Sequence, residues 1–224
     1  MSNILENLQR RFDHAALKPE TDEAAVRRLC AEARQFHFFS VAVNPVWVRT
    51  ARDELRGTDV KVLSVAGFPL GANRTDVKIM EAVKGVSDGA QEIDMAANIG
   101  WLVSDRFSDA EREIAEVRKA LPHNVLLKVI IEAGSLTESQ QAAATRAVVN
   151  GGAQFVKTCT GFFGGATVEQ VRTLYAAAEG RIEVKAAGGI RTLEQCCRML
   201  EAGATRLGSS VSVDIMRELV SCRL

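Results

Sequence analysis

The chain has 224 residues, of which 47% are hydrophobic and 25% charged, and its formal net charge is zero. This balance is ordinary for a soluble globular protein and gives no reason to expect nucleic acid or a membrane as a partner, and no apolar run is long enough to span a bilayer. The five cysteines fit no zinc-ribbon or disulfide spacing and the three histidines are scattered. This pattern favours reduced thiols in a cytoplasmic protein without a histidine-based zinc site.

Short β-prone runs alternate with segments of helical periodicity along the chain. After a polar leader over residues 1–11, strands are expected at 12–17, 40–44, 60–65, 91–97, 125–132, 155–158, 183–187 and 206–210. Helices are expected at 21–36, between Pro45 and about residue 55, at 75–87, at 109–120 and after the last strand. Three further helices open with a capping box, in which a threonine hydroxyl accepts from a free amide and a glutamine reaches back. These boxes are Thr137 with Gln140, Thr167 with Gln170 and Thr192 with Gln195.

Eight strands alternating with helices, without a linker or a low-complexity break, predict one α/β domain over residues 1–224. The expected architecture is a single (β/α)8 TIM barrel. The alternative is a doubly wound open sheet, but no Gly-x-Gly-x-x-Gly follows a strand and opens a helix. The glycine-rich run at 161–165 has neither that spacing nor the spacing of a P-loop.

The charged residues Asp94, Lys128, Lys157 and Lys185 all lie within predicted strands. Each is flanked by an apolar residue that would face the helices, so strand alternation directs each charged side chain into the barrel. Like charges and desolvation both lower the pKa of a lysine, and a neutral lysine is the nucleophile that Schiff-base chemistry needs. The alternative is a buried ion network that only stabilises the fold, although the cations would then outnumber the carboxylate.

Two glycine-containing loops follow the last two predicted strands. Gly188-Gly189-Ile190-Arg191 leads into the helix capped by Thr192, and Gly208-Ser209-Ser210 leads into the terminal helix. Backbone amides at helix N-termini bind anions, and the loops after strands seven and eight form the usual phosphate site of this fold. The pattern predicts a phosphate site, with simple tight-turn chemistry as the alternative.

Seven short motifs occur in a fixed order along nearly the whole chain. They are Asp13-His14 with Leu17-Lys18-Pro19, Val43-Asn44-Pro45, Gly67-Phe68-Pro69, Glu92-Ile93-Asp94-Met95, Leu127-Lys128-Val129-Ile130-Ile131-Glu132, Phe155-Val156-Lys157-Thr158 with Thr160-Gly161, and Val184-Lys185-Ala186 with Gly188-Gly189-Ile190-Arg191. The ordered set resembles the 2-deoxyribose-5-phosphate aldolase family, class I aldolases of deoxynucleoside breakdown. The resemblance implies a lyase that reversibly cleaves 2-deoxy-D-ribose 5-phosphate to D-glyceraldehyde 3-phosphate and acetaldehyde. It also implies small phosphosugar and aldehyde partners and a homodimer or homotetramer.

The resemblance further implies roles for individual residues. Lys157 would form the Schiff base, Lys185 would lower its pKa, and Asp94 would relay protons. No metal or organic cofactor is needed, because the imine itself is the electron sink. The residues expected at the substrate or its phosphate are Gly188, Gly189, Arg191, Gly208, Ser210, Thr160, Lys128 and Asp13, although Arg191 could equally point to solvent.

Several positions near the expected pocket depart from the family pattern. Alanine stands at Ala15, Ala42, Ala96, Ala97 and Ala187 where a polar or larger residue is usual, and Cys159 stands in place of a serine. These changes bear on substrate scope and phosphate affinity more than on the chemistry. Two other functions stay open as alternatives: a different phosphosugar enzyme, such as an isomerase or a transaldolase-like transferase, and a phosphometabolite-binding barrel without catalytic activity.

Overall fold

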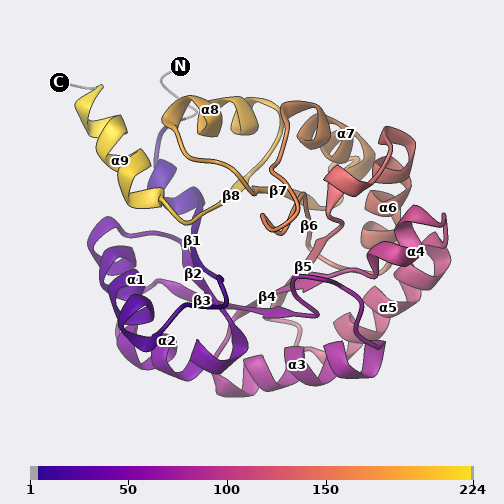
Figure 1. Cartoon of the computed structure of the whole chain (residues 1–224), viewed down its shortest axis with the longest axis horizontal. Coiled ribbons are helices and arrows are strands. Elements are labelled where there is room, and N and C mark those ends of the chain that lie inside the picture. Colours follow the sequence, from indigo (N-terminus) through magenta and orange to yellow (C-terminus); the bar gives the residue numbers. More distant parts are fainter. Residues whose placement is uncertain (1–4, 223–224) are drawn as a thin grey trace.

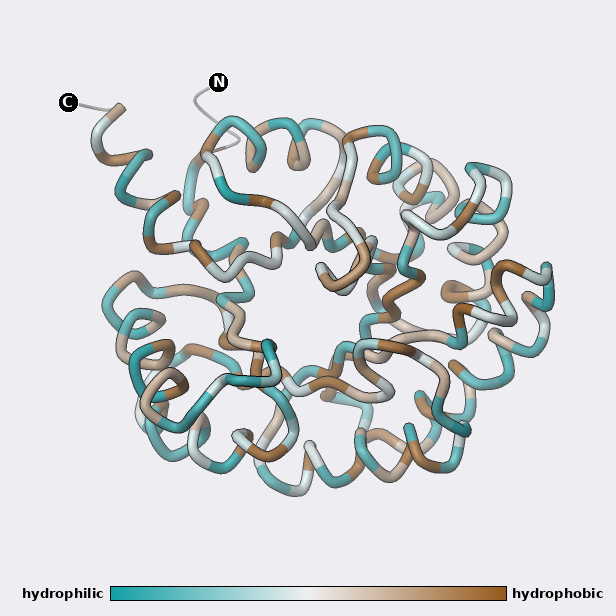
Figure 2. The backbone as a smooth tube through the Cα atoms, viewed as in Figure 1, coloured by the Kyte–Doolittle hydropathy of each residue, from teal (hydrophilic) through white to brown (hydrophobic). Residues whose placement is uncertain are grey.

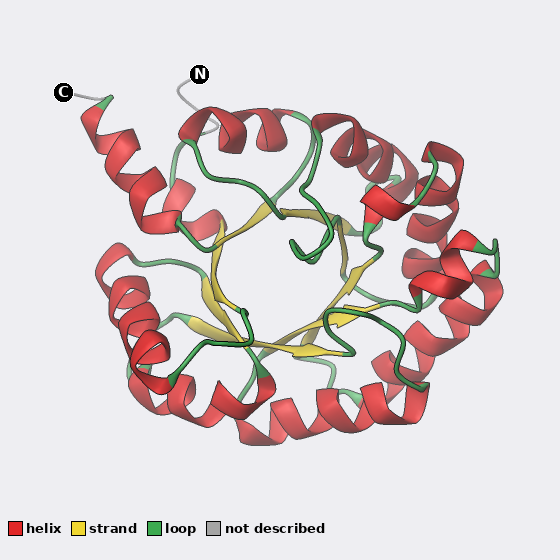
Figure 3. Cartoon of the chain, in the orientation of Figure 1, coloured by secondary structure: helices red, strands yellow, loops and turns green. Residues whose placement is uncertain are grey.

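The computed structural model describes residues 5–222, so the first four residues of the expected leader lie outside the described part. Eight parallel strands follow one another around a closed barrel, in which β8 pairs with β1. Helices form a ring outside the strands (Figures 1 and 3). The (β/α)8 barrel expected from the sequence is confirmed.

The strands are short and regularly spaced in the chain. They are β1 (Phe12–Ala16), β2 (Ser40–Val43), β3 (Lys61–Ala66), β4 (Glu92–Ala96), β5 (Leu126–Ile130), β6 (Phe155–Lys157), β7 (Glu183–Ala187) and β8 (Arg206–Ser209). The α-helices are α1 (Glu23–Phe36), α2 (Val48–Glu54), α3 (Thr75–Asp88), α4 (Ile99–Val103), α5 (Phe107–Ala120), α6 (Glu138–Asn150), α7 (Val168–Ala178), α8 (Leu193–Glu201) and α9 (Ser212–Ser221). Short 3-10 turns are η1 (Leu8–Arg11), η2 (Pro45–Trp47) and η3 (Ala133–Ser135).

Most predicted elements are confirmed, with strand ends within two residues of their expected positions. The three threonine–glutamine capping boxes are all present, at the starts of α6, α7 and α8. The helix α4 was not predicted from the sequence; at its start the Asn98 side chain accepts a hydrogen bond from the Trp101 N–H. The last part of the expected leader is η1, and its Leu8 is fully buried.

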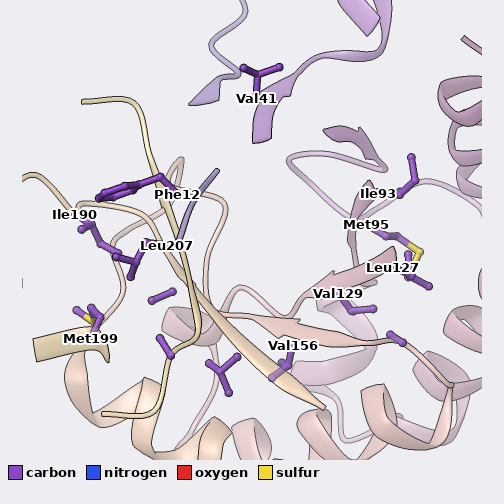
Figure 4. Packing of buried hydrophobic residues seen from close by; sticks show 14 of the residues in the cluster. Phe12, Val41, Ile93, Met95, Leu127, Val129, Val156, Ile190, Met199 and Leu207 are labelled. Atoms are coloured by element: carbon purple, nitrogen blue, oxygen red, sulfur yellow. The ribbon is translucent and has the colours of Figure 1, made fainter. Parts of the chain in front are cut away.

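The main hydrophobic core lies between the strands and the surrounding helices. Alternate strand residues point outward into it, and Ile93, Met95, Leu127, Val129 and Val156 are examples (Figure 4). Hydrophilic and hydrophobic residues alternate along the helices of the outer ring, as an amphipathic helix with one buried face requires (Figure 2). None of the helices within residues 5–222 has the length and apolar character needed to cross a membrane.

The interior of the barrel is divided into an apolar side and a charged side. On β2 and β3, the side chains of Ala42, Leu63 and Val65 form a small cluster against which Ala15 and Phe68 pack. Interior positions of β4 to β8 and of β1 include charged groups instead, from Glu92 and Asp94 round to Arg206 and Asp13. The fold therefore places ionisable side chains against one wall of a narrow, close-packed barrel, where each charge must find a partner.

Candidate active site

Four strands bring the predicted charged residues to one place inside the barrel. Asp94 on β4 stands in register with Lys128 on β5, and Lys157 on β6 stands in register with Lys185 on β7. Residues in register on parallel strands point to the same side of the sheet, here the barrel interior. All four side chains are buried, and even Lys157, at the end of its strand, is only 3% exposed.

Asp94 is the centre of this group. The Nζ atoms of Lys157 and Lys185 both donate to its Oδ2 atom, each at 2.8 Å. The ammonium of Lys128 lies 3.2 Å from the other oxygen, Oδ1, but outside hydrogen-bonding geometry. One carboxylate therefore accepts from two lysines at once, while its second oxygen accepts no hydrogen bond within the described residues.

A second layer of charges lies beside the first and was only partly foreseen. Asp13 contacts the Lys185 ammonium at 2.5 Å and accepts a hydrogen bond from Arg206 at 2.7 Å. The Glu92 carboxylate accepts hydrogen bonds from Lys128 and Arg206. The sequence analysis named Asp13 but missed Glu92 and Arg206, although Glu92 stands two residues before Asp94 and so shares its face of β4.

The charges of the two layers do not balance. Four cationic side chains, Lys128, Lys157, Lys185 and Arg206, face three carboxylates, those of Asp13, Glu92 and Asp94. Loss of one proton from a lysine would balance the set. Unpaired buried charge is costly, so this environment favours a neutral form of one lysine.

Lys157 has a lowered pKa and so readily loses its proton. The net pKa of Lys157 is lowered to about 8. Burial has the largest effect, and the positive charge of Lys185 adds to it, while the attraction of Asp94 opposes both. For Lys128, burial alone would lower the pKa, but Asp94, Glu92 and Asp13 hold it above its ordinary value. The structure thus separates a lysine that is poised to become neutral from a lysine that stays charged.

Asp94 stays ionised. Burial alone would raise the pKa of its carboxyl, but the summed attraction of Lys128, Lys157 and Lys185 holds it well below its usual value. A carboxylate that stays ionised beside a neutral amine can accept a proton and pass it on.

Aromatic rings from two distant loops cover the mouth of the barrel above Lys157. The ring centroid of Phe68, in the loop after β3, lies 5.9 Å from the Lys157 Nζ atom. Phe162, in the loop after β6, meets Phe68 edge to face with centroids 5.5 Å apart. The face of an aromatic ring attracts an ammonium, so this contact favours the charged form of Lys157 and opposes the effect of burial.

Thr158 connects the strand of Lys157 to the strand of Lys185. Its hydroxyl donates to the carbonyl of Ala187 at 3.0 Å and accepts from the N–H of the same residue, also at 3.0 Å. Its own N–H donates to the carbonyl of Lys185. These bonds fix the spacing between the two lysines, and sequence reasoning did not assign Thr158 a role.

The first glycine loop lies against the loop after β6, and Gly208 of the second lies against the end of β7. Gly188 and Gly189 have φ angles of 95° and 73°, values that suit glycine. Within the described residues, neither the N–H of Gly189 nor that of Ser210 has an acceptor. Gly208 allows close packing, because a Cβ there would lie 2.9 Å from the Cβ of Ala187. Free amides near two helix starts form a suitable anion site.

The other predicted substrate contacts fall into three groups. Arg191 is exposed, and its guanidinium makes no hydrogen bond or ion pair with any residue in the described range. Lys128 and Asp13 are fully buried among the charges described above. Thr160 lies at the mouth, where its hydroxyl and its N–H both donate to the Glu132 carboxylate.

The residues that depart from the expected pattern also lie around the interior. Ala15 and Ala42 belong to the apolar side of the barrel, and Ala96, Ala97 and Ala187 are buried at strand ends. Cys159 is buried next to the lysine strand, and burial with the nearby Glu132 charge raises the pKa of its thiol to about 11. The thiol is therefore protonated at neutral pH and is a poor nucleophile.

Comparisons with known proteins match the chain over nearly its full length. A sequence model of the DeoC/LacD family of aldolases matches residues 10–215. The deoxyribose-phosphate aldolase of Enterococcus faecalis is 44% identical over 210 residues, which cover 93% of this chain and 96% of that protein.

Solved structures are similar in fold and in sequence. A putative deoxyribose-phosphate aldolase from Coccidioides immitis superposes with a TM-score of 0.92 at 38% identity, covering 97% of this chain and 86% of that one. The deoxyribose phosphate aldolase from Aeropyrum pernix, described as having a unique tetrameric structure, superposes with a TM-score of 0.91 at 30% identity, covering 99% and 94%.

Proposed function

The chain belongs to the DeoC/LacD family of aldolases, and from this premise we propose that it is a deoxyribose-phosphate aldolase with Lys157 as its Schiff-base residue. The reaction is the reversible retro-aldol cleavage of 2-deoxy-D-ribose 5-phosphate to D-glyceraldehyde 3-phosphate and acetaldehyde, a lyase step in deoxyribonucleotide breakdown. The observation that carries the proposal is the shared bond of Lys157 and Lys185 to Asp94 in a buried, water-poor site. That arrangement provides a nucleophile, a group that lowers its pKa and a proton carrier.

The first step needs a neutral amine. With a pKa of about 8, roughly a tenth of Lys157 is uncharged at pH 7, against well under a thousandth for an ordinary lysine. The neutral Nζ attacks the C1 aldehyde of the open-chain sugar, and loss of water forms an iminium ion. The positive charge of Lys185 lowers the pKa of Lys157 and so opposes reprotonation of the amine before attack.

The second step moves a proton and breaks the C2–C3 bond. Asp94 takes the proton of the C3 hydroxyl, directly or through a water, and the C2–C3 electron pair moves into the iminium to give an enamine. Carbon C3 of the substrate becomes the aldehyde carbon of glyceraldehyde 3-phosphate, which leaves the site. The enamine is then protonated at C2, and hydrolysis releases acetaldehyde and free Lys157. Asp94 does not retain the proton, because the three lysines keep its pKa low.

The phosphate of the substrate is assigned to the glycine loops. The N–H groups of Gly189 and Ser210 are free to donate, and the loops lead directly to α8 and α9. Gly188 and Gly208 let these loops pack closely, because a Cβ at either position would meet neighbouring protein atoms at 2.9 to 3.0 Å. Arg191 supplies long-range positive charge at the same loop, and its exposed position makes its contribution smaller than that of the amides.

Assembly as a homodimer or homotetramer and a cytoplasmic location stay predictions. The Aeropyrum pernix relative is described as tetrameric, and this supports assembly of the present chain into an oligomer without fixing the number of copies.

The decisive experiment is borohydride trapping with 2-deoxyribose 5-phosphate, followed by peptide mass spectrometry. Reduction fixes an imine as a stable amine, so a mass increase on the peptide with Lys157 is expected. An adduct on another lysine would overturn the assignment of the nucleophile. A folded protein that binds the sugar phosphate without forming any adduct would favour the non-catalytic binding barrel. Release of acetaldehyde distinguishes this aldolase from an isomerase or a transaldolase-like enzyme.

A further inference from the structure

Glu132 has an unusual backbone and an unusual environment. It follows β5 at the mouth of the barrel, and its φ and ψ angles of 42° and 58° place it in the left-handed region. Five non-glycine residues in the described range have positive φ, and Glu132 alone among them is buried, at 2% exposure. Residues with a Cβ atom avoid this conformation unless the surrounding structure requires it, and such strain concentrates at functional sites.

The Glu132 carboxylate binds one residue of the neighbouring loop. Its Oε2 atom accepts from the Thr160 hydroxyl at 2.6 Å and from the Thr160 N–H at 3.1 Å. No lysine, arginine or histidine of the described part forms an ion pair with this carboxylate. The charge is therefore stabilised by neutral donors, which is the role that an orienting carboxylate plays.

These bonds determine what the Thr160 hydroxyl can do. A hydroxyl has one proton to donate, and this proton is directed at Glu132. The same oxygen accepts from the N–H of Phe162 at 3.2 Å. A phosphate oxygen needs a donor, and the hydroxyl has none left to offer. The contribution of Thr160 is thus to fix the shape of its loop.

The loop that Thr160 anchors contacts both parts of the substrate site. On one side, Ala166 N–H donates to the carbonyl of Gly188 at 3.0 Å, and a Cβ at Gly188 would lie 3.0 Å from the Gly164 carbonyl oxygen. On the other side, Phe162 packs on Phe68 above the reactive lysine. Residues 164–166 touch Gly188 directly, so a shift of the loop would move the wall of the phosphate site.

We propose that Glu132 is a positioning residue which, through Thr160, holds the 158–166 loop against Gly188 and so gives the site its selectivity for phosphorylated over unphosphorylated aldoses. This inference rests on the proposed aldolase function and on the assignment of the phosphate to the glycine loops. Glu132 touches neither the substrate nor the reacting atoms, and its effect reaches the substrate only through the loop.

Three variants test the proposal. Glu132→Ala removes the acceptor, Thr160→Val removes the donor hydroxyl while keeping a β-branched side chain, and Glu132→Gln keeps one oxygen that can accept both bonds from Thr160. Each is assayed for kcat and KM with 2-deoxyribose 5-phosphate and with 2-deoxyribose. Thermal unfolding of each variant measures any effect on the fold.

Glu132→Ala and Thr160→Val are expected to lower kcat/KM for the phosphorylated sugar by about tenfold to a hundredfold, mainly through KM. The kcat/KM for 2-deoxyribose should change much less, so the ratio of kcat/KM for the phosphorylated sugar to that for the unphosphorylated sugar falls. Glu132→Gln should restore most of that ratio. A purely structural role would lower both activities in parallel with the melting temperature, and that result, or an unchanged ratio in Glu132→Ala, would overturn the proposal.

The outcomes also separate this inference from the proposed function. If the unaltered protein cleaves 2-deoxyribose 5-phosphate but the variants keep its substrate ratio, only the role of Glu132 is refuted. If the unaltered protein forms no imine and releases no acetaldehyde, the aldolase function fails and this inference fails with it. Should Glu132→Ala not fold, the comparison of Thr160→Val with Glu132→Gln still decides the question.

Discussion

Lys157 and Lys185 share a single hydrogen-bond acceptor, the Oδ2 atom of Asp94, which lies 2.8 Å from each Nζ atom. Two ammonium ions that share one carboxylate oxygen repel each other at short range. The repulsion is relieved when either lysine loses its proton, and Lys157 is the one with the lowered pKa. Schiff-base reactivity in this site therefore depends on a geometric relation among three side chains from three strands.

Replacing Lys157 with arginine is expected to abolish turnover without unfolding the protein. Arginine keeps a positive charge that can pair with Asp94, but a guanidinium stays protonated and does not form an imine. Acetaldehyde release and borohydride trapping should both fall to background, while the circular dichroism spectrum stays unchanged. The matched control is Lys84→Arg, since the Lys84 side chain is 60% exposed and its only ion pair within residues 5–222 is with Asp88. Activity retained in Lys157→Arg would remove Lys157 from the mechanism.

Replacing Lys185 with leucine should shift the activity profile to higher pH. The positive charge of Lys185 lowers the pKa of Lys157, so its loss raises that pKa and leaves less neutral amine at a given pH. The midpoint of the acid-to-neutral limb of the kcat/KM profile is expected to rise from about 8 by about 1 to 2 units. A profile that does not move would assign the effect to another cation, and Lys128 is the next candidate.

The sequence identified these residues because a charged side chain inside an apolar strand is conspicuous. Lys128 and Lys185 have apolar neighbours on both sides and Lys157 follows Val156, so strand alternation predicts that all three face the barrel interior. Glu92 and Arg206 begin their strands, where a charge normally reaches water, and the only local signal is the two-residue spacing that puts Glu92 on the same face as Asp94. They become recognisable only when the closed barrel brings β4 and β8 within reach of one another.

Contacts between distant loops were also beyond sequence reasoning. Phe68 and Phe162 are far apart in the chain, and no periodicity relates them, yet their rings meet over Lys157. The bond between Glu132 and Thr160 likewise joins two loops. Periodic patterns describe which face of an element is buried, whereas the packing of loop on loop depends on the three-dimensional positions of the strands.

Replacing Asp94 with asparagine should separate imine formation from carbon–carbon cleavage. The Asp94 charge raises the pKa of Lys157, so its removal lowers that pKa and extends the neutral form of the amine to lower pH. Borohydride should therefore still trap the imine on Lys157, and it should do so at lower pH than in the unaltered protein. Turnover should fall by about 10²- to 10⁴-fold, because no carboxylate remains to accept the C3 hydroxyl proton.

The two measurements on Asp94→Asn are made on the same protein preparation across a pH series. Parallel loss of trapping and turnover would mean that Asp94 acts in imine formation or in folding. Normal turnover would mean that a different group accepts the proton. Removing the carboxylate also leaves buried lysines uncompensated, so a lower melting temperature is expected and is measured alongside.

Replacing Gly188 with alanine should weaken binding of the phosphorylated substrate. The φ angle of 95° is strained for alanine, and the new Cβ atom would lie 3.0 Å from the Gly164 carbonyl oxygen and 3.2 Å from the Gly165 Cα atom. The loop after β6 would have to move away from the phosphate site. KM for 2-deoxyribose 5-phosphate is expected to rise by about tenfold or more, with a smaller change in kcat.

Gly57 provides the control for backbone strain. Its φ angle is 80°, and a Cβ atom there would meet nothing within 4 Å, so Gly57→Ala carries a similar conformational cost without a collision. Both variants should lose about 1 kcal/mol of unfolding free energy from the backbone, but only Gly188→Ala should change KM. Equal KM values in the two variants would show that the glycine loop is a tight turn without a part in phosphate binding. That was the alternative left open by the sequence, and this pair of variants decides between the two.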